Sequence, residues 1–229
     1  MKRILSYFTK VELALWIASM LFILISFLLF DRENYLTLIA SLLGATSLIF
    51  CAKGNPIGMI IMIVFSLLYG YISLTFHYYG EMLTYIGMTL PMSIFSLVAW
   101  LKNPYNGKVS EVAVRKLCRA DILHMAVLTV IVTILFYFLL GYFHTANLIP
   151  STISVTTSFF AVLLTYKRSP YFALAYAAND IVLIVLWTLA AVRDISYISV
   201  VICFITFLAN DIYGFLNWKN MQKKQNEGI

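Results

Sequence analysis

The stretch that decides the fold is YAANDIVLIVLWTLAAVRDISYISVVICFITFLANDIYGFLNW, residues 176–218. It holds two apolar runs, and each is close to the ~20 residues that an α-helix needs to cross a bilayer. Each run contains an Asn-Asp pair, Asn179-Asp180 in the first and Asn210-Asp211 in the second. A charged side chain at the bilayer centre costs roughly 2.5–3.5 kcal/mol even on insertion scales. We therefore expect the pairs to line a polar pocket or pathway, with interhelical hydrogen bonding as the alternative role.

The composition is that of an integral membrane protein. Hydrophobic residues make up 62% of the 229 residues and charged residues only 11%, against roughly 25% charged in a soluble domain. The net charge of +6 lies beside the apolar runs, which is typical of membrane topology signals and not of a nucleic-acid-binding face. The three cysteines are unclustered, so neither a metal site nor a disulfide framework is expected. Without a phosphate-binding loop or a catalytic motif, the sequence favours neither an enzyme nor an ATP-driven pump, and it calls for no cofactor.

The apolar segments are separated by short polar links. Because each segment is near the length of one crossing, the sequence predicts an all-α integral membrane protein with eight transmembrane helices. The segments are 13–30, 35–52, 57–77, 81–101, 121–143, 148–166, 170–192 and 195–217.

The basic residues predict the topology. If the N-terminus is inside, every Lys and Arg except Arg32 and Arg193 falls on the inner side of the membrane. This asymmetry is the one that the positive-inside rule describes. Both termini are therefore predicted to be cytoplasmic.

The spans also predict an internal repeat. The three that start at 35, 57 and 81 are spaced like the three that start at 148, 170 and 195. One linking span between two triplets makes both enter the membrane from the same side, which gives parallel repeats. The predicted order is a basic leader with a peripheral transmembrane helix (1–33), a first three-helix repeat (34–103), a basic cytoplasmic loop with the linking helix (104–146), a second three-helix repeat (147–220) and a cytoplasmic tail (221–229). The predicted helices are thus an N-terminal helix followed by a core of three, one and three helices (3+1+3).

Helical spacing selects candidate binding residues around the two pairs. Tyr176, Asp180 and Trp187 share one helix face, with Asn179 beside it. On the next helix Phe207 and Asn210 share a face, with Asp211 adjacent. Flat aromatic rings beside amides suit a planar heterocycle that carries a polar sugar. A cationic ring would gain further from the carboxylates.

The first triplet offers fewer polar groups. Tyr69 precedes Trp100 by the same number of residues as Trp187 precedes Trp218, which makes Tyr69 a candidate. The following helix supplies Tyr85 and Thr89 as further candidates. Glu81 at its start is expected to cap the helix, with the lining of an outer vestibule as the alternative role.

The phrases ANDIVLIVLW at 178–187 and FLANDIYGFLNW at 207–218, together with the 3+1+3 order, resemble the PnuC family of bacterial vitamin-precursor transporters. The resemblance implies a homotrimer in the bacterial cytoplasmic membrane that equilibrates nicotinamide riboside by facilitated diffusion, with trapping by a separate cytoplasmic phosphorylation. It implies a substrate held near the bilayer middle by Asn179, Trp187 and Asn210, with Asp180 and Asp211 beside them.

Other functions stay open at this point. One is a proton-coupled carrier, in which Asp180 or Asp211 exchanges a proton. Another is a carrier for thiamine, riboflavin or a deoxynucleoside, which the spacing does not exclude. A third is a membrane receptor that transports nothing.

Overall fold

The computed structural model describes residues 7–75, 79–145 and 147–227. Within these residues, eight helical segments are long and apolar enough to cross a membrane, which confirms the predicted number. The first three are α2 (Lys10–Phe30), α3 (Tyr35–Ala52) and α4 (Ile57–Thr75). The fourth is built from α5 (Tyr79–Met82), η1 (Leu83–Thr89) and α6 (Leu90–Leu101). The others are α7 (Arg119–Tyr142), α8 (Leu148–Tyr166), α9 (Tyr171–Ala191) and α10 (Ile198–Glu227), the last preceded by the short turn η2 (Ile195–Tyr197).

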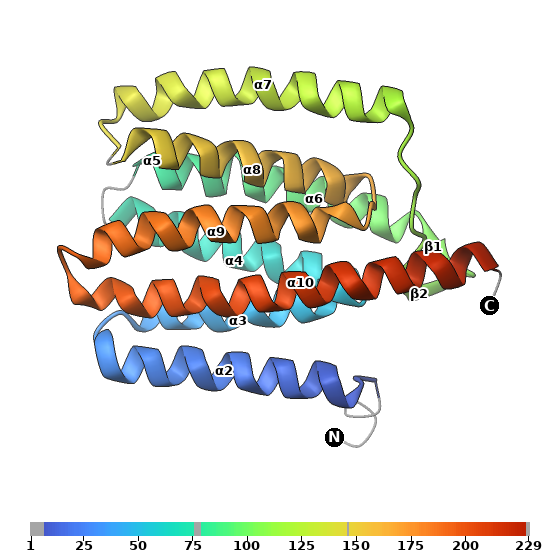
Figure 1. Ribbon diagram of the computed structural model, residues 1–229, viewed down its shortest axis with the longest axis horizontal. Coiled ribbons are helices and arrows are strands. Elements are labelled where there is room, and N and C mark those ends of the chain that lie inside the picture. The colour runs from blue at the N-terminus through green and yellow to red at the C-terminus, as the bar shows by residue number, and fades with distance from the viewer. Residues whose placement is uncertain (1–6, 76–78, 146, 228–229) are drawn as a thin grey trace.

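The helices lie side by side as an elongated bundle (Figure 1). In this view α8, α9 and α10 lie in front of α6, α4 and α3, while α7 and α2 lie along opposite edges. α9 packs against α8 and α10, and α4 packs against α3 and α6. The two groups meet where α3 packs on α10 and α6 packs on α8.

The two ends of the bundle differ in charge. We call the end with Lys53, Lys102, Lys167 and Lys219 the basic end, and the end with Arg32 and Arg193 the far end. The described parts of both chain termini lie toward the basic end (Figure 1). The arrangement therefore keeps most basic residues of the described chain at one end, as the sequence predicted.

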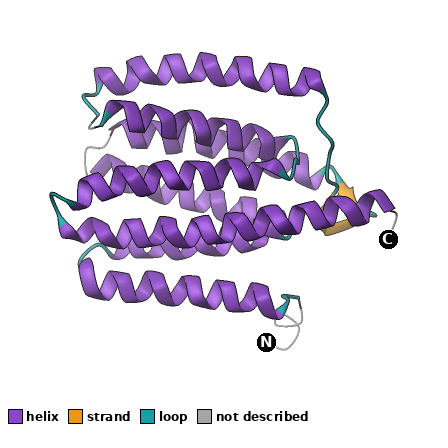
Figure 2. Cartoon of the chain, in the orientation of Figure 1, coloured by secondary structure: helices purple, strands orange, loops and turns teal. Residues whose placement is uncertain are grey.

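The loop after α6 contains a short hairpin that the all-α prediction did not include. Strand β1 (Pro104–Tyr105) pairs antiparallel with β2 (Lys108–Val112), next to the end of α10 (Figure 2). Asn106 and Gly107 have positive φ values of 48° and 74°, as a two-residue hairpin turn requires. The Asn-Gly pair was the sequence signal for this turn.

α10 continues ten residues beyond the predicted end of the last span at 217. The hairpin holds this extension, because the side chain of Gln225 accepts from Val114 N at 2.7 Å and donates to Val112 O at 3.1 Å. The segment expected to be a cytoplasmic tail is thus helical as far as Glu227.

The fourth span changes its helical geometry in the middle. Residues 83–89 form a π-helix, and the N–H of Leu90 donates to Tyr85 O, five residues back. Pro91 follows directly, and a proline has no N–H to continue the α-helical ladder. Within the wider turn, Thr89 Oγ1 donates to the backbone oxygen of Thr84 at 3.1 Å.

Candidate functional site

A cavity of about 130 Å³ lies inside the bundle. Its walls come from α3, α4, the fourth span, α7, α8, α9 and α10, so both groups of helices contribute. Rings, hydroxyls, one amide and three carboxyl groups line it. The polar and aromatic lining residues include Glu81, Thr84, Tyr85, Thr89, Ser151, Ser154, Ser158, Tyr176, Asn179, Asp180, Trp187, Phe204, Phe207 and Asp211.

The first Asn-Asp pair lies on α9 and points into this cavity. The Oδ1 of Asn179 accepts from Ser154 Oγ at 3.0 Å and from Thr157 Oγ1 at 2.8 Å, both on α8. These bonds fix the orientation of the amide. No described residue accepts a hydrogen bond from its Nδ2, so the NH₂ group is the part of Asn179 available to a ligand.

Two carboxyl groups meet in the cavity. Asp180 and Asp211 are each only 4% exposed, and both line the cavity. Oδ2 of Asp180 has no partner among the described residues, and a buried acceptor without a partner costs roughly 1–3 kcal/mol. This oxygen is therefore placed to accept from a ligand.

Aromatic rings surround the polar groups. Trp187 is 9% exposed and packs against Tyr197, with 5.3 Å between ring centroids. Tyr176 faces the cavity from the same helix, α9, while Tyr85 faces it from η1 and Phe207 from α10. The rings offer flat apolar surface to a ligand whose polar edge reaches Asn179.

The structure brings together most of the residues that the sequence selected, but not all. Asn210 does not line the cavity, because its Nδ2 donates to Ser19 Oγ on α2 at 2.8 Å and to Thr206 O at 2.7 Å. Tyr69 packs behind Tyr85, with 4.5 Å between ring centroids. The selected residues that do line the cavity are Trp187, Asn179, Asp180, Asp211, Tyr176, Tyr85, Thr89 and Phe207.

Sequence reasoning missed the contribution of α8. Ser151, Ser154 and Ser158 line the cavity, and their spacing of three and four residues puts them on one helix face. That spacing was the signal that could have found them. Glu81, for which capping was the first expectation and the lining of an outer vestibule the alternative, lines the cavity.

A recess of about 160 Å³ lies on the far-end side of the cavity. Glu81 and Trp187 line both spaces, so they lie between them. Asp31 and Asp194 lie in the recess as well. The backbone N–H of Ser196 donates to Asp194 at 3.0 Å and lowers the pKa of that carboxyl group. The recess therefore carries negative charge, which attracts cations.

The basic-end side is closed by packed aromatic rings. Trp100, Phe172 and Trp218 are at most 2% exposed, and the two tryptophan rings lie 5.3 Å apart. Nε1 of Trp100 donates to Thr165 O at 3.0 Å, and Nε1 of Trp218 donates to Cys51 O at 2.8 Å. Each tryptophan thus ties the last helix of one group to the first helix of the other.

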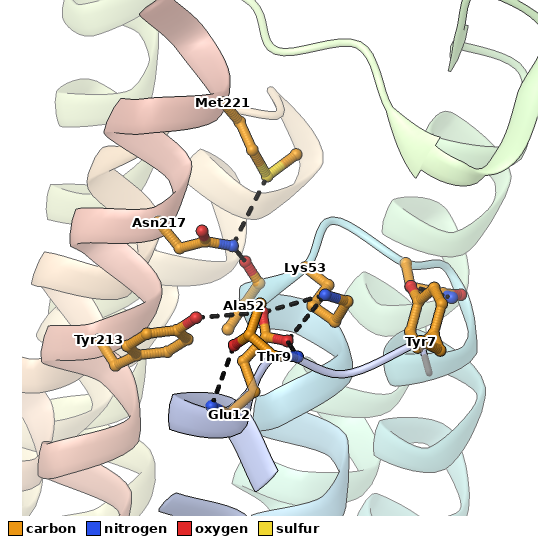
Figure 3. Close-up of polar contacts among 9 residues, drawn as sticks. Tyr7, Thr9, Glu12, Ala52, Lys53, Tyr213, Asn217 and Met221 are labelled. Atoms are coloured by element: carbon orange, nitrogen blue, oxygen red, sulfur yellow. Dashed lines mark hydrogen bonds and ion pairs between the residues drawn. The ribbon is translucent and has the colours of Figure 1, made fainter. Parts of the chain in front are cut away.

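We call the packed rings of Trp100, Phe172 and Trp218 the tryptophan seal. A cluster around Glu12 holds α10 in place beside it (Figure 3). The carboxylate of Glu12 pairs with Lys53 Nζ at 2.8 Å, and it accepts from Thr9 N at 2.7 Å and from Tyr213 OH at 3.0 Å. The N–H₂ of Asn217 donates to the backbone oxygen of Ala52 at 2.8 Å. α2, the end of α3 and α10 are thereby joined at one point.

A similar cluster holds α7. Asp121 pairs with Lys167 at 2.8 Å and with Arg115 at 2.8 Å. Glu12 and Asp121 occupy the same position in their helices, the third residue after the N-cap. Each carboxylate binds the lysine that follows the next helix, Lys53 after α3 or Lys167 after α8.

The family follows from residues 34–220, which match the family model described as nicotinamide mononucleotide transporter. The chain belongs to this family of membrane transporters. The resemblance to PnuC proteins seen in the sequence is thereby confirmed.

Two relatives bear the name nicotinamide riboside transporter PnuC. The one from Neisseria mucosa is 24% identical over 216 residues, which cover 92% of this chain and 82% of the relative. The one from Haemophilus influenzae is 23% identical over 223 residues, which cover 96% of this chain and 92% of the relative. A crystal structure of the vitamin B3 transporter PnuC superposes with a TM-score of 0.81 at 21% identity, covering 95% of this chain and 94% of that one. The fold of the family is thus present over nearly the whole chain.

Proposed function

We propose that this transporter carries nicotinamide riboside across the bacterial cytoplasmic membrane by facilitated diffusion. The observation that carries the proposal is the cavity between the two groups of helices, where Trp187, Asn179 and the Asp180–Asp211 pair meet. Nicotinamide riboside combines a cationic aromatic ring, an amide and a sugar. The names of the two relatives support the same substrate.

Each part of the substrate has a chemical partner in the cavity. The cationic ring stacks on Trp187 and Tyr176, which gains cation–π attraction in addition to buried area. The NH₂ group of Asn179 donates to a substrate oxygen. Oδ2 of Asp180, which lacks a partner among the described residues, accepts from a sugar hydroxyl.

The cavity must widen when the substrate enters. Its volume of about 130 Å³ is below the roughly 300–1,000 Å³ of ordinary ligand pockets. We infer that the basic end faces the cytoplasm, because of its lysines. Substrate then arrives through the negatively charged recess and leaves when Trp100 and Trp218 separate.

The remaining functional assignments belong to the same proposal. The chain acts as a transporter and not as an enzyme, so a separate cytoplasmic kinase traps the substrate by phosphorylation. The resemblance to PnuC proteins supports a homotrimer in which each protomer has its own pathway.

A second candidate is a proton-coupled carrier, and the specific observation in its favour is that two buried carboxyl groups, Asp180 and Asp211, line the same cavity. In such a carrier, one of them releases a proton when a cationic substrate binds. The substrate classes that remain as alternatives are thiamine, riboflavin and deoxynucleosides.

Uptake into proteoliposomes tests the proposal and separates the two candidates. With purified protein, labelled nicotinamide riboside should equilibrate to equal concentrations on both sides and should not accumulate when a pH gradient is imposed. Trp187→Ala should reduce uptake, whereas Leu189→Ala, an exposed position on the same helix, should not. Accumulation that follows the pH gradient would favour the proton-coupled carrier, and the absence of uptake would refute the assigned substrate.

A further inference from the structure

A second, larger space of about 920 Å³ opens on the side of the bundle, between α7, α8 and α9. Its sides are apolar over most of their length. Ile122 and Met125 contribute from α7, Phe160 and Leu164 from α8, and Leu174 from α9. We call this space the side groove.

The end of the side groove is polar and positively charged. Arg115, Lys116, Ser169 and Gln222 line it there. Lys116 is exposed and forms no ion pair with any residue that the structure describes. Ser169 is 1% exposed, and its Oγ has no hydrogen-bond partner in the described chain. A buried hydroxyl without a partner points to a ligand that supplies one.

Further cations surround this end. The backbone oxygen of Arg168 accepts from Arg115 N at 3.0 Å, and burial together with the charge of Arg115 lowers the pKa of Arg168. Lys219 lies 5.1 Å from the ring centroid of Tyr171, which lines the side groove. Asp121 offsets part of this charge through its pairs with Arg115 and Lys167. The net charge at this end of the side groove remains positive, so it attracts an anion.

The side groove fits within one leaflet. Along α7 it runs from Ile122 to Thr129, a distance of about 10 Å at roughly 1.5 Å per residue. Half of the hydrocarbon core of a bilayer is about 15 Å thick, so the groove stays on one side of the bilayer middle. The charged end lies at the basic end of the bundle, where the membrane surface is expected.

We propose that the side groove binds an anionic phospholipid from the leaflet at the basic end. The headgroup phosphate pairs with Lys116 and accepts a hydrogen bond from Ser169 Oγ. One acyl chain lies against Phe160 and Leu164. The inference goes beyond the proposed transport activity and does not depend on the substrate.

Charge complementarity favours a lipid over a second copy of this chain. A copy would have to offer carboxylates to the positive end, and the basic end of the described chain has few. Glu12 and Asp121 are already paired with lysines, and Glu111 accepts from Gln225 Nε2 at 3.1 Å. Phospholipids with a net negative charge supply the missing anion.

The side groove also touches the support of the candidate substrate site. Thr157 lines the groove and donates to Oδ1 of Asn179 at 2.8 Å. One side chain therefore separates an acyl chain in the groove from the amide that faces the cavity.

Native mass spectrometry of the purified protein can test this site. The probes are phosphatidylglycerol and phosphatidylcholine with the same acyl chains. We expect tighter retention of phosphatidylglycerol, and a loss of about five-fold in its affinity for Lys116→Gln, because one lysine near a membrane surface contributes about that factor. Ser169→Ala should lower the same affinity. Ala178→Phe, which narrows the groove, should lower retention of both lipids.

Lys223→Gln is the matched control, since Lys223 is an exposed lysine of the same end that does not line the groove. Equal retention of the two lipids by the parent protein would overturn the proposal. An equal loss in Lys116→Gln and Lys223→Gln would also overturn it, because it would show general surface attraction. Disulfide crosslinking between copies at Ala178→Cys would assign the groove to an interface between copies. Lys116 is exposed, so its substitution decides the matter even if a groove variant fails to fold.

Discussion

The two Asn-Asp pairs are equivalent in sequence but not in structure, and alanine substitution of each asparagine should separate their roles. Asn179→Ala removes the amide that faces the cavity, whereas Asn210→Ala removes an amide that binds Ser19 on α2. We therefore expect Asn179→Ala to lower substrate affinity and Asn210→Ala to lower stability. The sequence alone selected both as binding residues.

The expected magnitudes follow from the hydrogen bonds. In Asn179→Ala the substrate loses a polar partner inside a closed cavity, which costs about 1–3 kcal/mol. Affinity should fall by roughly five-fold to more than a hundred-fold at ~1.4 kcal/mol per decade. In Asn210→Ala the interhelical bond to Ser19 is lost, and such bonds between membrane helices average about 0.6 kcal/mol with a maximum near 1.7. Affinity should change by less than about three-fold.

Both quantities can be measured on the same samples. Equilibrium binding of labelled nicotinamide riboside gives the affinity, and reversible unfolding in mixed micelles gives the stability. Ser19→Ala and the double variant with Asn210→Ala complete a cycle that isolates the interhelical bond. If Asn210→Ala weakens binding as much as Asn179→Ala while stability is unchanged, the assignment of Asn210 to helix packing is refuted.

Three more results are expected. Glu12→Gln should destabilise the protein by up to about 3–5 kcal/mol in unfolding measurements, because it leaves the ammonium of Lys53 without its buried partner; an unchanged stability would contradict this. Trp187→Ala should weaken binding of the cationic substrate by more than Trp187→Phe does, since a phenyl ring keeps part of the stacking surface; equal affinities would show that the ring does not touch substrate. Trp218→Phe should raise the labelling of a cysteine placed at Ser96 by a reagent added from the basic end, because the hydrogen bond to Cys51 O is lost; unchanged labelling would exclude this bond from the closure.

Most of the fold could be read from the sequence, because hydrophobic length and charge placement act locally. The eight spans needed only the recognition of apolar runs, and most of their boundaries lie within two residues of the observed helices. The hairpin at 104–112 and the extension of α10 were missed. They depend on each other, since Gln225 is held by a strand that no local pattern connects to it.

The candidate site could be predicted only in part, because a helix face does not reveal which neighbour it meets. Asp211 faces the cavity and Asn210 faces α2, although the two are adjacent in the chain. One step along an α-helix turns a side chain by about 100°, which separates two contact partners. The sequence placed α2 at the periphery, but Ser19 on α2 binds Asn210 and so turns this amide away from the cavity.

The clusters at the basic end give α2 and α7 a common role. Glu12 joins α2 to Lys53 after α3 and to Tyr213 on α10. Asp121 joins α7 to Lys167 after α8. One turn and a half beyond Tyr213, Trp218 reaches back to Cys51 O at the end of α3. The same helix carries Asp211 into the cavity. A displacement of α10 that opens the tryptophan seal must therefore also move the carboxyl group that faces the substrate, and the Glu12 cluster sets how easily this happens.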